Sequence, residues 1–388
     1  MSDANTVEER SAREARAASD TEMTAEQLAE ARRYGRAQLA CDLADKGIDL
    51  AYLGLVAFLF ARPLDAWLHA LLPNDSLRLV ALYLVTMLIY ECVSLPLSFY
   101  SGHVLEQRFG LSTQSAGAWV ARHFKRYGVA VGFGLVMFFA LFWVIWLCGG
   151  YWWLVASCAF FVVSVVLGQL TPVLILPLFY KIERLDDAEL GQRMQRLAAG
   201  TGLSIEGVYR MSLSQETAKA NAMLAGLGRT RRVILGDTLL SEFSHDEIEV
   251  ILAHEIGHHV HRHLPKMIAA GALFSLAGFW VCDRLVAAWR GVDDPATMPV
   301  YALPMLLFGL TAVAMVLEPL QNIISRRYER QCDRYALART GLKAAYISAF
   351  RKLAKQNKDD PAPNAVEVFL FHSHPPIAQR LALAEDAS

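Results

Sequence analysis

The sequence has few charged residues and no excess of basic ones. Only 19% of its 388 residues are Asp, Glu, Lys or Arg, and the formal net charge is −1. A protein that binds nucleic acid needs a basic surface to neutralise phosphates, so this balance excludes nucleic acid as the main partner. Hydrophobic residues make up 54% of the chain, a share that indicates a membrane protein instead.

Cysteines are also few, and none has the spacing of a metal-binding pair. The six cysteines contain no CxxC sequence, and most fall in apolar stretches, where a free thiol behaves as a small hydrophobic side chain. We therefore expect neither a disulfide framework nor a cysteine-ligated zinc. The start of the chain lacks the features of a cleaved signal peptide, so residues 1–45 are expected to form a polar cytoplasmic tail.

Six long apolar stretches occupy much of the chain. Each approaches or exceeds the ~20 residues that a helix needs to cross hydrocarbon. Six are too many for the core of one soluble protein, so the pattern predicts a multi-pass helical membrane protein. The stretches lie at residues 50–72, 77–99, 127–148, 152–179, 268–289 and 300–324.

Four ionisable residues interrupt these apolar stretches. A charge in lipid is costly, so we expect each of them to face an interior cavity or a partner. A structural ion pair, or a side chain that reaches the membrane interface, is an equally good alternative. The four residues are Glu91, Asp283, Arg284 and Glu318.

Lys and Arg are concentrated in alternate connections between the apolar stretches. The positive-inside rule therefore places the amino terminus and these connections on the cytoplasmic side. The basic segments include residues 32–36, 108–126, 181–266 and the chain after 325, whereas the opposite loops at 73–76, 149–150 and 290–299 carry little positive charge.

An HExxH motif at His254 to His258 is the strongest functional signal. Residues four apart lie on one face of a helix, so His254 and His258 can present two imidazoles to one zinc ion. Glu255 beside them can reach a metal-bound water as general base. The alternative is a surface helix that matches the motif by chance. A catalytic zinc needs a third protein ligand, which must come from elsewhere.

A second predicted helix supplies the best candidate for that ligand. Glu329 would complete a His, His, Glu set, with water in the open fourth position of one zinc per chain. Asp333, one turn later on the same face, could accept the far ring N–H of a ligand histidine and fix its tautomer. The alternative is a charged surface helix in which Glu329 pairs with Arg326 or Arg330.

The polar segment 186–265 predicts a small α+β insert. We expect a helix at 188–201, strands at 207–211, 222–224 and 232–235, and a turn at 226–228. Ser244 and Glu247 form a capping box that opens the HExxH helix, which we expect to run to about His263, before Pro265. Three further histidines are expected to be solvated or interfacial: His259, His261 and His263.

Together these motifs make the chain similar to a known family. The sequence resembles the integral-membrane zinc metalloprotease family that includes the type 1 CAAX prenyl protease, over about residues 33–383. The resemblance rests on HExxH, the NxxSRxxExxxD pattern from Asn322 to Asp333, the Ser373-His374-Pro375-Pro376 sequence with Arg380, and shorter matches at residues 108–112, 221–222, 226–228, 231–235 and 237–240.

The resemblance implies further properties of the site. His374 and Arg380 are expected to contact substrate, and the membrane helices to enclose a large water-filled chamber. We also expect the substrate backbone to pair with an edge strand that carries Asn221, Ala222 and Met223. Two departures stand out: a polar tail replaces the first of the family's usual seven helices, and Cys332 replaces a usual alanine, where we expect no functional consequence.

We therefore predict a mainly α, multi-pass membrane protein with about six transmembrane helices and a small cytoplasmic α+β zinc-metalloprotease domain. Its expected parts are a tail (1–45), amino-terminal transmembrane helices (46–180), the insert with HExxH (181–266), two further transmembrane helices (267–324) and a carboxy-terminal part (325–388).

The predicted activity is zinc-dependent endoproteolysis resembling CAAX prenyl endopeptidase. The alternatives are a membrane-protein quality-control protease or, less favoured, a transporter or scaffold with a structural zinc. Expected partners are a peptide or protein substrate, lipidated or membrane-embedded, and membrane lipids. The Ala- and Arg-rich character favours the inner membrane of a bacterium, with the endoplasmic reticulum as the alternative.

Overall fold

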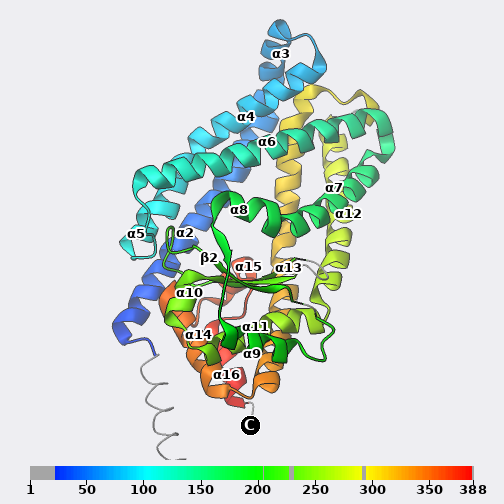
Figure 1. The fold of residues 1–388 in the computed structure, drawn as a ribbon. Helices are drawn as coiled ribbons and strands as arrows, with labels where there is room; N and C mark the ends of the chain where they lie inside the picture. The colour runs from blue at the N-terminus through cyan, green and yellow to red at the C-terminus, as the bar shows by residue number, and fades with distance from the viewer. Residues whose placement is uncertain (1–21, 204, 227–230, 291–293, 387–388) are drawn as a thin grey trace, which may run out of the picture.

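The computed structural model describes residues 22–203, 205–226, 231–290 and 294–386, and it is mainly helical (Figure 1). Long helices form one end of the molecule, and a small sheet with shorter helices forms the other. The long elements are α2 (Ala25–Leu55), α3 (Ala61–Leu71), α4 (Asp75–Phe99), α6 (Ala116–Cys148), α7 (Trp152–Leu170), α12 (His263–Arg290) and α13 (Leu303–Thr340).

Five helical segments of the described chain are long and apolar enough to cross a membrane. The third of them contains two of the six predicted stretches, because the 3₁₀ turn Gly149–Tyr151 joins α6 to α7 without a polar loop. Figure 1 shows the chain reversing there, and α6 packs against α7. The five segments are Ala25–Leu71, Asp75–Arg108, Ala116–Phe179, His263–Arg290 and Val300–Thr340.

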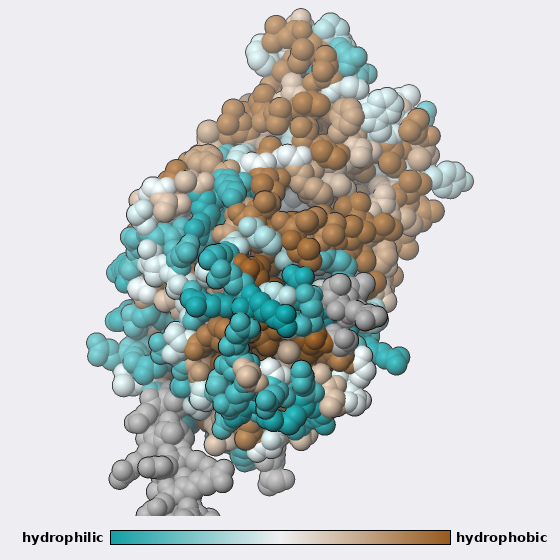
Figure 2. Space-filling view, viewed as in Figure 1, coloured by the Kyte–Doolittle hydropathy of each residue, from teal (hydrophilic) through white to brown (hydrophobic). Residues whose placement is uncertain are grey.

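Apolar side chains cover the outside of this helical end. Val136, Leu147 and Val162 are each more than half exposed, as expected for side chains that face lipid rather than water. In Figure 2 hydrophobic residues dominate the helical end, whereas hydrophilic residues dominate the end that carries the sheet. The predicted mainly helical, membrane-embedded architecture is therefore confirmed.

The ionisable groups of the apolar stretches have partners. Glu91 Oε1 lies 2.7 Å from His123 Nε2, and Trp152 Nε1 donates to Asp283 Oδ1 at 2.7 Å. Lys46 reaches from α2 to Glu318 on α13 at 2.6 Å, and Arg284 pairs with its neighbour Asp283. The first three contacts link different helices, the Asp283–Arg284 pair lies within α12, and together they avoid unpaired charges in lipid.

A cavity of about 820 Å³ lies among α6, α7, α12 and α13. Its lining is mainly apolar, with a few polar groups such as Gln169 and Gln321. This cavity has the character of a pocket for an apolar group, and the water-filled chamber implied by the resemblance stays a prediction. Its lining includes Leu264 and Met267 at the start of α12, so one end of it lies beside the HExxH region.

The sheet has four short strands in the order β1-β2-β4-β3. Their bounds are β1 Ile182–Arg184, β2 Gly207–Met211, β3 Ala222–Ala225 and β4 Arg232–Gly236. The three predicted strands are confirmed, β1 was too short to be predicted, and residues 227 and 228 of the predicted turn lie outside the described residues. β2 and β4 are parallel, while β1 and β3 pair antiparallel with their neighbours.

Helices cover the sheet and build the core of this end. α9 (Ala188–Ala198), α11 (His245–Val260), α14 (Lys343–Asn357) and α16 (Ile377–Asp386) share one cluster of buried apolar residues with β2 and β4. α9 ends three residues before the predicted Thr201, because Gly200 adopts a left-handed conformation (φ +79°) that ends a helix. Two shorter helices complete this end: α10 (Asp237–Glu242) and α15 (Ala365–Phe371).

The capping box is confirmed, but the predicted end of the HExxH helix is wrong. Ser244 and Glu247 make both reciprocal hydrogen bonds at the start of α11. The helix ends at Val260 rather than near His263, because Arg262 is left-handed (φ +54°) and α12 begins directly after it. Pro265 does not stop α11. It lies in the first turn of α12, where its missing N–H leaves no helical hydrogen bond unmade.

Candidate metal centre

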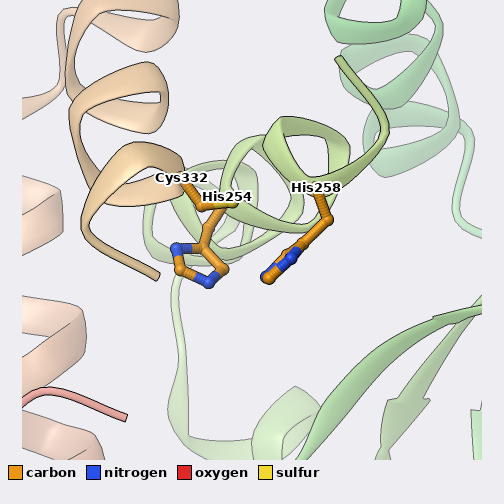
Figure 3. Close-up of side chains that lie close together, drawn as sticks. All are labelled: His254, His258 and Cys332. Atoms are coloured by element: carbon orange, nitrogen blue, oxygen red, sulfur yellow. The ribbon is translucent and has the colours of Figure 1, made fainter. Parts of the chain in front are cut away.

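Two histidines of α11 project into the same space. The ring centroids of His254 and His258 are 5.3 Å apart, as expected for side chains one helical turn apart. Figure 3 shows both rings leaving α11 on one side, with Cys332 on the neighbouring helix. His254 is buried, whereas the His258 side chain is 30% exposed, so one side of the pair is open to an incoming molecule.

Glu329 of α13 contacts both imidazoles. Its Oε2 lies 3.1 Å from His254 Nε2, and its Oε1 lies 3.2 Å from His258 Nε2. Tetrahedral ligands about 2.1 Å from a zinc ion lie roughly 3.4 Å from each other, so these atoms nearly have the separations of a zinc site. Glu329 is 4% exposed, so water cannot solvate its carboxylate. A buried charge needs a partner of opposite charge, and a bound metal ion would provide one.

Behind His254, a buried ion pair fixes the ring. Asp333 Oδ1 lies 2.9 Å from His254 Nδ1, and Arg380 Nε donates to Asp333 Oδ2 at 3.0 Å. Burial alone would lower the pKa of His254, but the hydrogen bonds with Asp333 and Glu329 outweigh it and raise the pKa to about 9. A proton therefore occupies this imidazole in the metal-free site and has to leave when a metal binds.

Cys332 forms a second possible ligand group with the two histidines. Its sulfur and one nitrogen of each of His254 and His258 lie within 4.8 Å of one another. The thiol is fully buried, and its sulfur also lies 3.5 Å from His263 Nδ1. Glu329 is the better third ligand, because its two oxygens face the Nε2 atoms of both rings at 3.1 and 3.2 Å.

Glu255 and His374 border this centre without being fixed by it. Glu255 is half-buried, and within the described chain its carboxylate makes no hydrogen bond or ion pair. The His374 side chain is 63% exposed, and its Nε2 lies 3.6 Å from Glu329 Oε2. Both groups are therefore available to a substrate, whereas Arg380 is buried behind Asp333 with its guanidinium 3.9 Å from the Phe350 ring.

The strand that carries Ala222 and Met223 lies at an edge of the sheet. β3 pairs with β4 on one side, and no other strand of the described chain pairs with it. Asn221 precedes β3, and its carbonyl accepts a hydrogen bond from Gly236 at 2.9 Å. Because α11 packs against β3, this edge is close to the HExxH helix.

One functional neighbour was missed by the sequence analysis. His263, expected to be solvated or interfacial, is only 1% exposed, and its Nδ1 lies 3.2 Å from His258 Nδ1. The expectation was wrong because the turn at Arg262 redirects the chain, so helical spacing from His258 does not locate His263. His259 is half-buried, and its Nδ1 lies 2.9 Å from Arg231 Nη1.

Gly257 allows α11 and α13 to approach closely at this centre. A Cβ at position 257 would lie 3.1 Å from Cys332 Cα, a contact that only a backbone shift can relieve. We expect Gly257→Ala to separate the helices, to cost about 1–3 kcal/mol of stability as other overpacked sites do, and to weaken zinc binding.

Thermal unfolding in detergent and zinc competition with a chelator measure both effects. Gly191→Ala on α9 is the matched control, since an added Cβ there meets nothing within 4 Å, and we expect it to leave both measurements unchanged or slightly improved. Wild-type zinc affinity in Gly257→Ala would show that the close approach is dispensable.

Comparisons with known proteins agree with this geometry. The profile of peptidase family M48 matches residues 184–388, and that of the CAAX prenyl protease amino-terminal region, with five membrane helices, matches residues 9–181. The chain is 29% identical to uncharacterized metalloprotease YhfN of Bacillus subtilis, covering 84% of this chain and 77% of that protein. It is 28% identical to CAAX prenyl protease 1 of Saccharomyces cerevisiae, covering 76% and 69%.

The fold is also similar to a solved structure. The crystal structure of S. mikatae Ste24p matches with a TM-score of 0.77 and 25% identity, covering 93% of this chain and 89% of that one. The family resemblance predicted from the motifs is thus confirmed. The chain belongs to peptidase family M48, as a membrane zinc metalloprotease that resembles CAAX prenyl protease 1.

Proposed function

We propose that the protein cleaves peptide bonds at one zinc ion held by His254, His258 and Glu329, with water at the fourth position. The observation that carries this proposal is the Glu329 carboxylate, whose two oxygens face the Nε2 atoms of both histidines. Three protein ligands and an open side are the arrangement of a catalytic zinc, whereas a structural zinc is closed by four. This difference disfavours a transporter or scaffold with a structural zinc.

The side chains around the metal have different roles in hydrolysis. Bound zinc supplies Lewis acidity, which lowers the pKa of water toward ~7. Glu255 accepts the proton of the attacking water and returns it to the leaving amine, because its carboxylate is free of other partners in the described chain. His374, exposed beside Glu329, donates a hydrogen bond to the oxyanion of the tetrahedral intermediate.

Asp333 and Arg380 act on the site from behind. Asp333 accepts the Nδ1 hydrogen of His254 and thereby leaves Nε2 free for zinc. Arg380 balances the charge of Asp333, and its Nη2 lies 3.9 Å from Glu329. Direct substrate contact by Arg380 was predicted from the family resemblance, while the buried contacts favour a positioning role.

The substrate lies as an added strand along β3. No other strand of the described chain occupies the outer edge of β3, which lies close to α11, and an extended peptide there would pair with Asn221, Ala222 and Met223. Strand pairing binds the backbone of the substrate peptide and leaves its side chains free to enter pockets that set specificity. It also keeps the peptide extended, as attack on its carbonyl requires.

A lipidated or membrane-embedded substrate suits this molecule best. The cavity among α6, α7, α12 and α13 is apolar, and its lining begins at Leu264, next to His263. The relatives include proteins named CAAX prenyl protease 1, which supports a prenylated peptide. Cleavage of misfolded or translocation-stalled membrane proteins is the second candidate, because the same cavity would accept an apolar peptide segment.

The topology proposed from Lys and Arg places the active site on the cytoplasmic side. The tail, the sheet and the carboxy-terminal part would share that side, and we propose part boundaries at residues 45, 180, 266 and 324. The inner membrane of a bacterium is the proposed location, with the endoplasmic reticulum as the alternative. Membrane lipids would then contact the exposed apolar surface.

We expect Glu255→Gln to keep its zinc. Its rate of peptide cleavage should fall about 10²–10⁴-fold, since an amide can neither accept nor return the proton. Zinc content by atomic absorption and cleavage of a fluorogenic peptide measure the two properties. Glu242→Gln, at the end of α10, is a charge-matched control expected to keep both. Parallel loss of zinc and activity in Glu255→Gln would make Glu255 a structural residue.

The two possible ligand groups are separated by a pair of variants on α13. Glu329→Ala should lower zinc occupancy sharply, because it removes one of three ligands, whereas Cys332→Ala should keep stoichiometric zinc. Both variants are measured after dialysis against a weak chelator. Loss of zinc in Cys332→Ala would make the thiol the third zinc ligand. Full zinc occupancy in Glu329→Ala would mean that the third ligand is the thiol or Asp333.

Membrane entry of the substrate predicts a lipid effect. In vesicles, a prenylated peptide should be cleaved with a higher kcat/KM than its unprenylated twin, because lipid burial contributes roughly 0.8 kcal/mol per methylene. In the same assay without vesicles, the difference in kcat/KM between the two peptides should become smaller, because only binding of the lipid in the protein's own cavity then favours the prenylated one. Equal kcat/KM for both peptides in vesicles would contradict entry from the membrane and leave the zinc mechanism intact.

A further inference from the structure

His263 is the most confined histidine near the metal centre. It starts α12 and is 1% exposed, although the sequence places it at the end of a polar, histidine-rich segment. Its ring stacks on Tyr328 of α13, with centroids 4.2 Å apart and planes 12° apart, and also on His261 at 5.5 Å and 22°. Stacking on these rings sets the plane of the imidazole, so its two nitrogens point in fixed directions.

Each nitrogen of His263 has a partner. Nε2 lies 2.9 Å from Gln331 Oε1, and Nδ1 lies 3.2 Å from His258 Nδ1. An amide oxygen can only accept, so the ring hydrogen of neutral His263 lies on Nε2 and is donated to Gln331. Its Nδ1 is then an acceptor, which also lies 3.5 Å from the Cys332 sulfur.

The direction of these bonds decides the tautomer of His258. Because His263 Nδ1 accepts, the hydrogen between the two rings belongs to His258 Nδ1. His258 Nε2 therefore carries the lone pair, and this is the atom that lies 3.2 Å from Glu329 Oε1. The lone pair points at the place where His254 Nε2 and Glu329 also converge.

We propose that His263 is a positioning residue that holds His258 in the metal-binding tautomer, through a relay from Gln331 to His263 to His258. The inference rests on the proposed zinc site. It gives the two histidine ligands different supports: the buried Asp333 carboxylate for His254, and a neutral imidazole for His258. His263 is not itself a ligand in this arrangement, since both of its nitrogens are engaged by protein groups.

The difference in support has a chemical consequence. A carboxylate partner makes a ligand imidazole more basic and adds negative charge near the metal, whereas a neutral imidazole orients the ring without adding charge. The buried negative charges near the zinc are then those of Glu329 and Asp333, and Arg380 balances the second. His263 thus orients His258 while leaving the zinc electrophilic toward water.

Two substitutions at position 263 separate this role from packing. His263→Phe keeps an aromatic ring against Tyr328 but cannot accept a hydrogen bond, so we expect zinc affinity to fall about 10–100-fold, as for other partners of metal ligands. His263→Asn places an amide oxygen near the position of Nδ1 and should recover most of that loss. Zinc affinity is measured by chelator competition on the purified full chain in detergent.

Two more readouts complete the test. The visible absorption of the Co²⁺-substituted protein should change in His263→Phe, because a released His258 ring alters the ligand geometry, and should return toward wild type in His263→Asn. His261→Phe is the matched control: it makes the same change in the ring that stacks on His263 and should leave zinc affinity unchanged. Thermal unfolding of the metal-free variants should stay near wild type.

The outcomes are distinguishable from failure of the proposed function. A wild-type protein that binds no zinc would overturn the zinc site itself. If wild type binds zinc and His263→Phe binds it equally well, the relay is wrong. If His263→Phe loses zinc affinity and His263→Asn does not recover it, His263 acts through packing alone. The same conclusion follows if His261→Phe loses zinc affinity too and the metal-free variants unfold at a lower temperature.

Discussion

The structure depends on one contact between two helices, the Glu329 carboxylate lying across the two histidines of the HExxH motif. α11 provides two imidazoles on one face, which any helix with this spacing could do. The proposed third ligand, Glu329, comes from α13, 71 positions later than His258, so the site exists only where these helices cross. Gly257 lets the backbones approach at that crossing, and the Asp333–Arg380 pair holds the back of His254.

α12 and α13 connect the metal centre to the membrane part. α13 is 38 residues long and carries both an apolar segment and, near its end, Glu329 and Asp333. α12 begins three residues after α11 ends and starts with His263, which contacts the metal side of α11. Shifts of these membrane helices would therefore move the ligands directly.

Much of this could be predicted from the sequence because the signals are local. The HExxH spacing, the capping box at Ser244 and the three strands each depend on neighbours within a few residues, and the fold bears out the helix start and the strands. The need for a third ligand indicated Glu329, and the motif resemblance indicated His374, Arg380 and the family. The end of α11 was misplaced because a single left-handed residue, Arg262, breaks the helix where no glycine or proline marks it.

The burial of His263 and its bond to His258 could not be predicted, since they arise from that break and from α13 packing against α12. The turn between α6 and α7 could be predicted, because Gly149 and Gly150 separate the apolar stretches 127–148 and 152–179. For His263 the missing information was tertiary. Local pattern predicted the candidate ligands and Asp333, whereas the contact of His263 with His258 depends on the packing of the helices.

X-ray absorption spectroscopy of the zinc-loaded protein is the most direct test of Glu329 as the third ligand, because it reports the atoms bound to the metal. We expect only nitrogen and oxygen ligands at about 2.0–2.2 Å from the zinc, from two imidazoles, one carboxylate and one water. A sulfur at about 2.3 Å would place Cys332 on the metal and contradict the role assigned to Glu329.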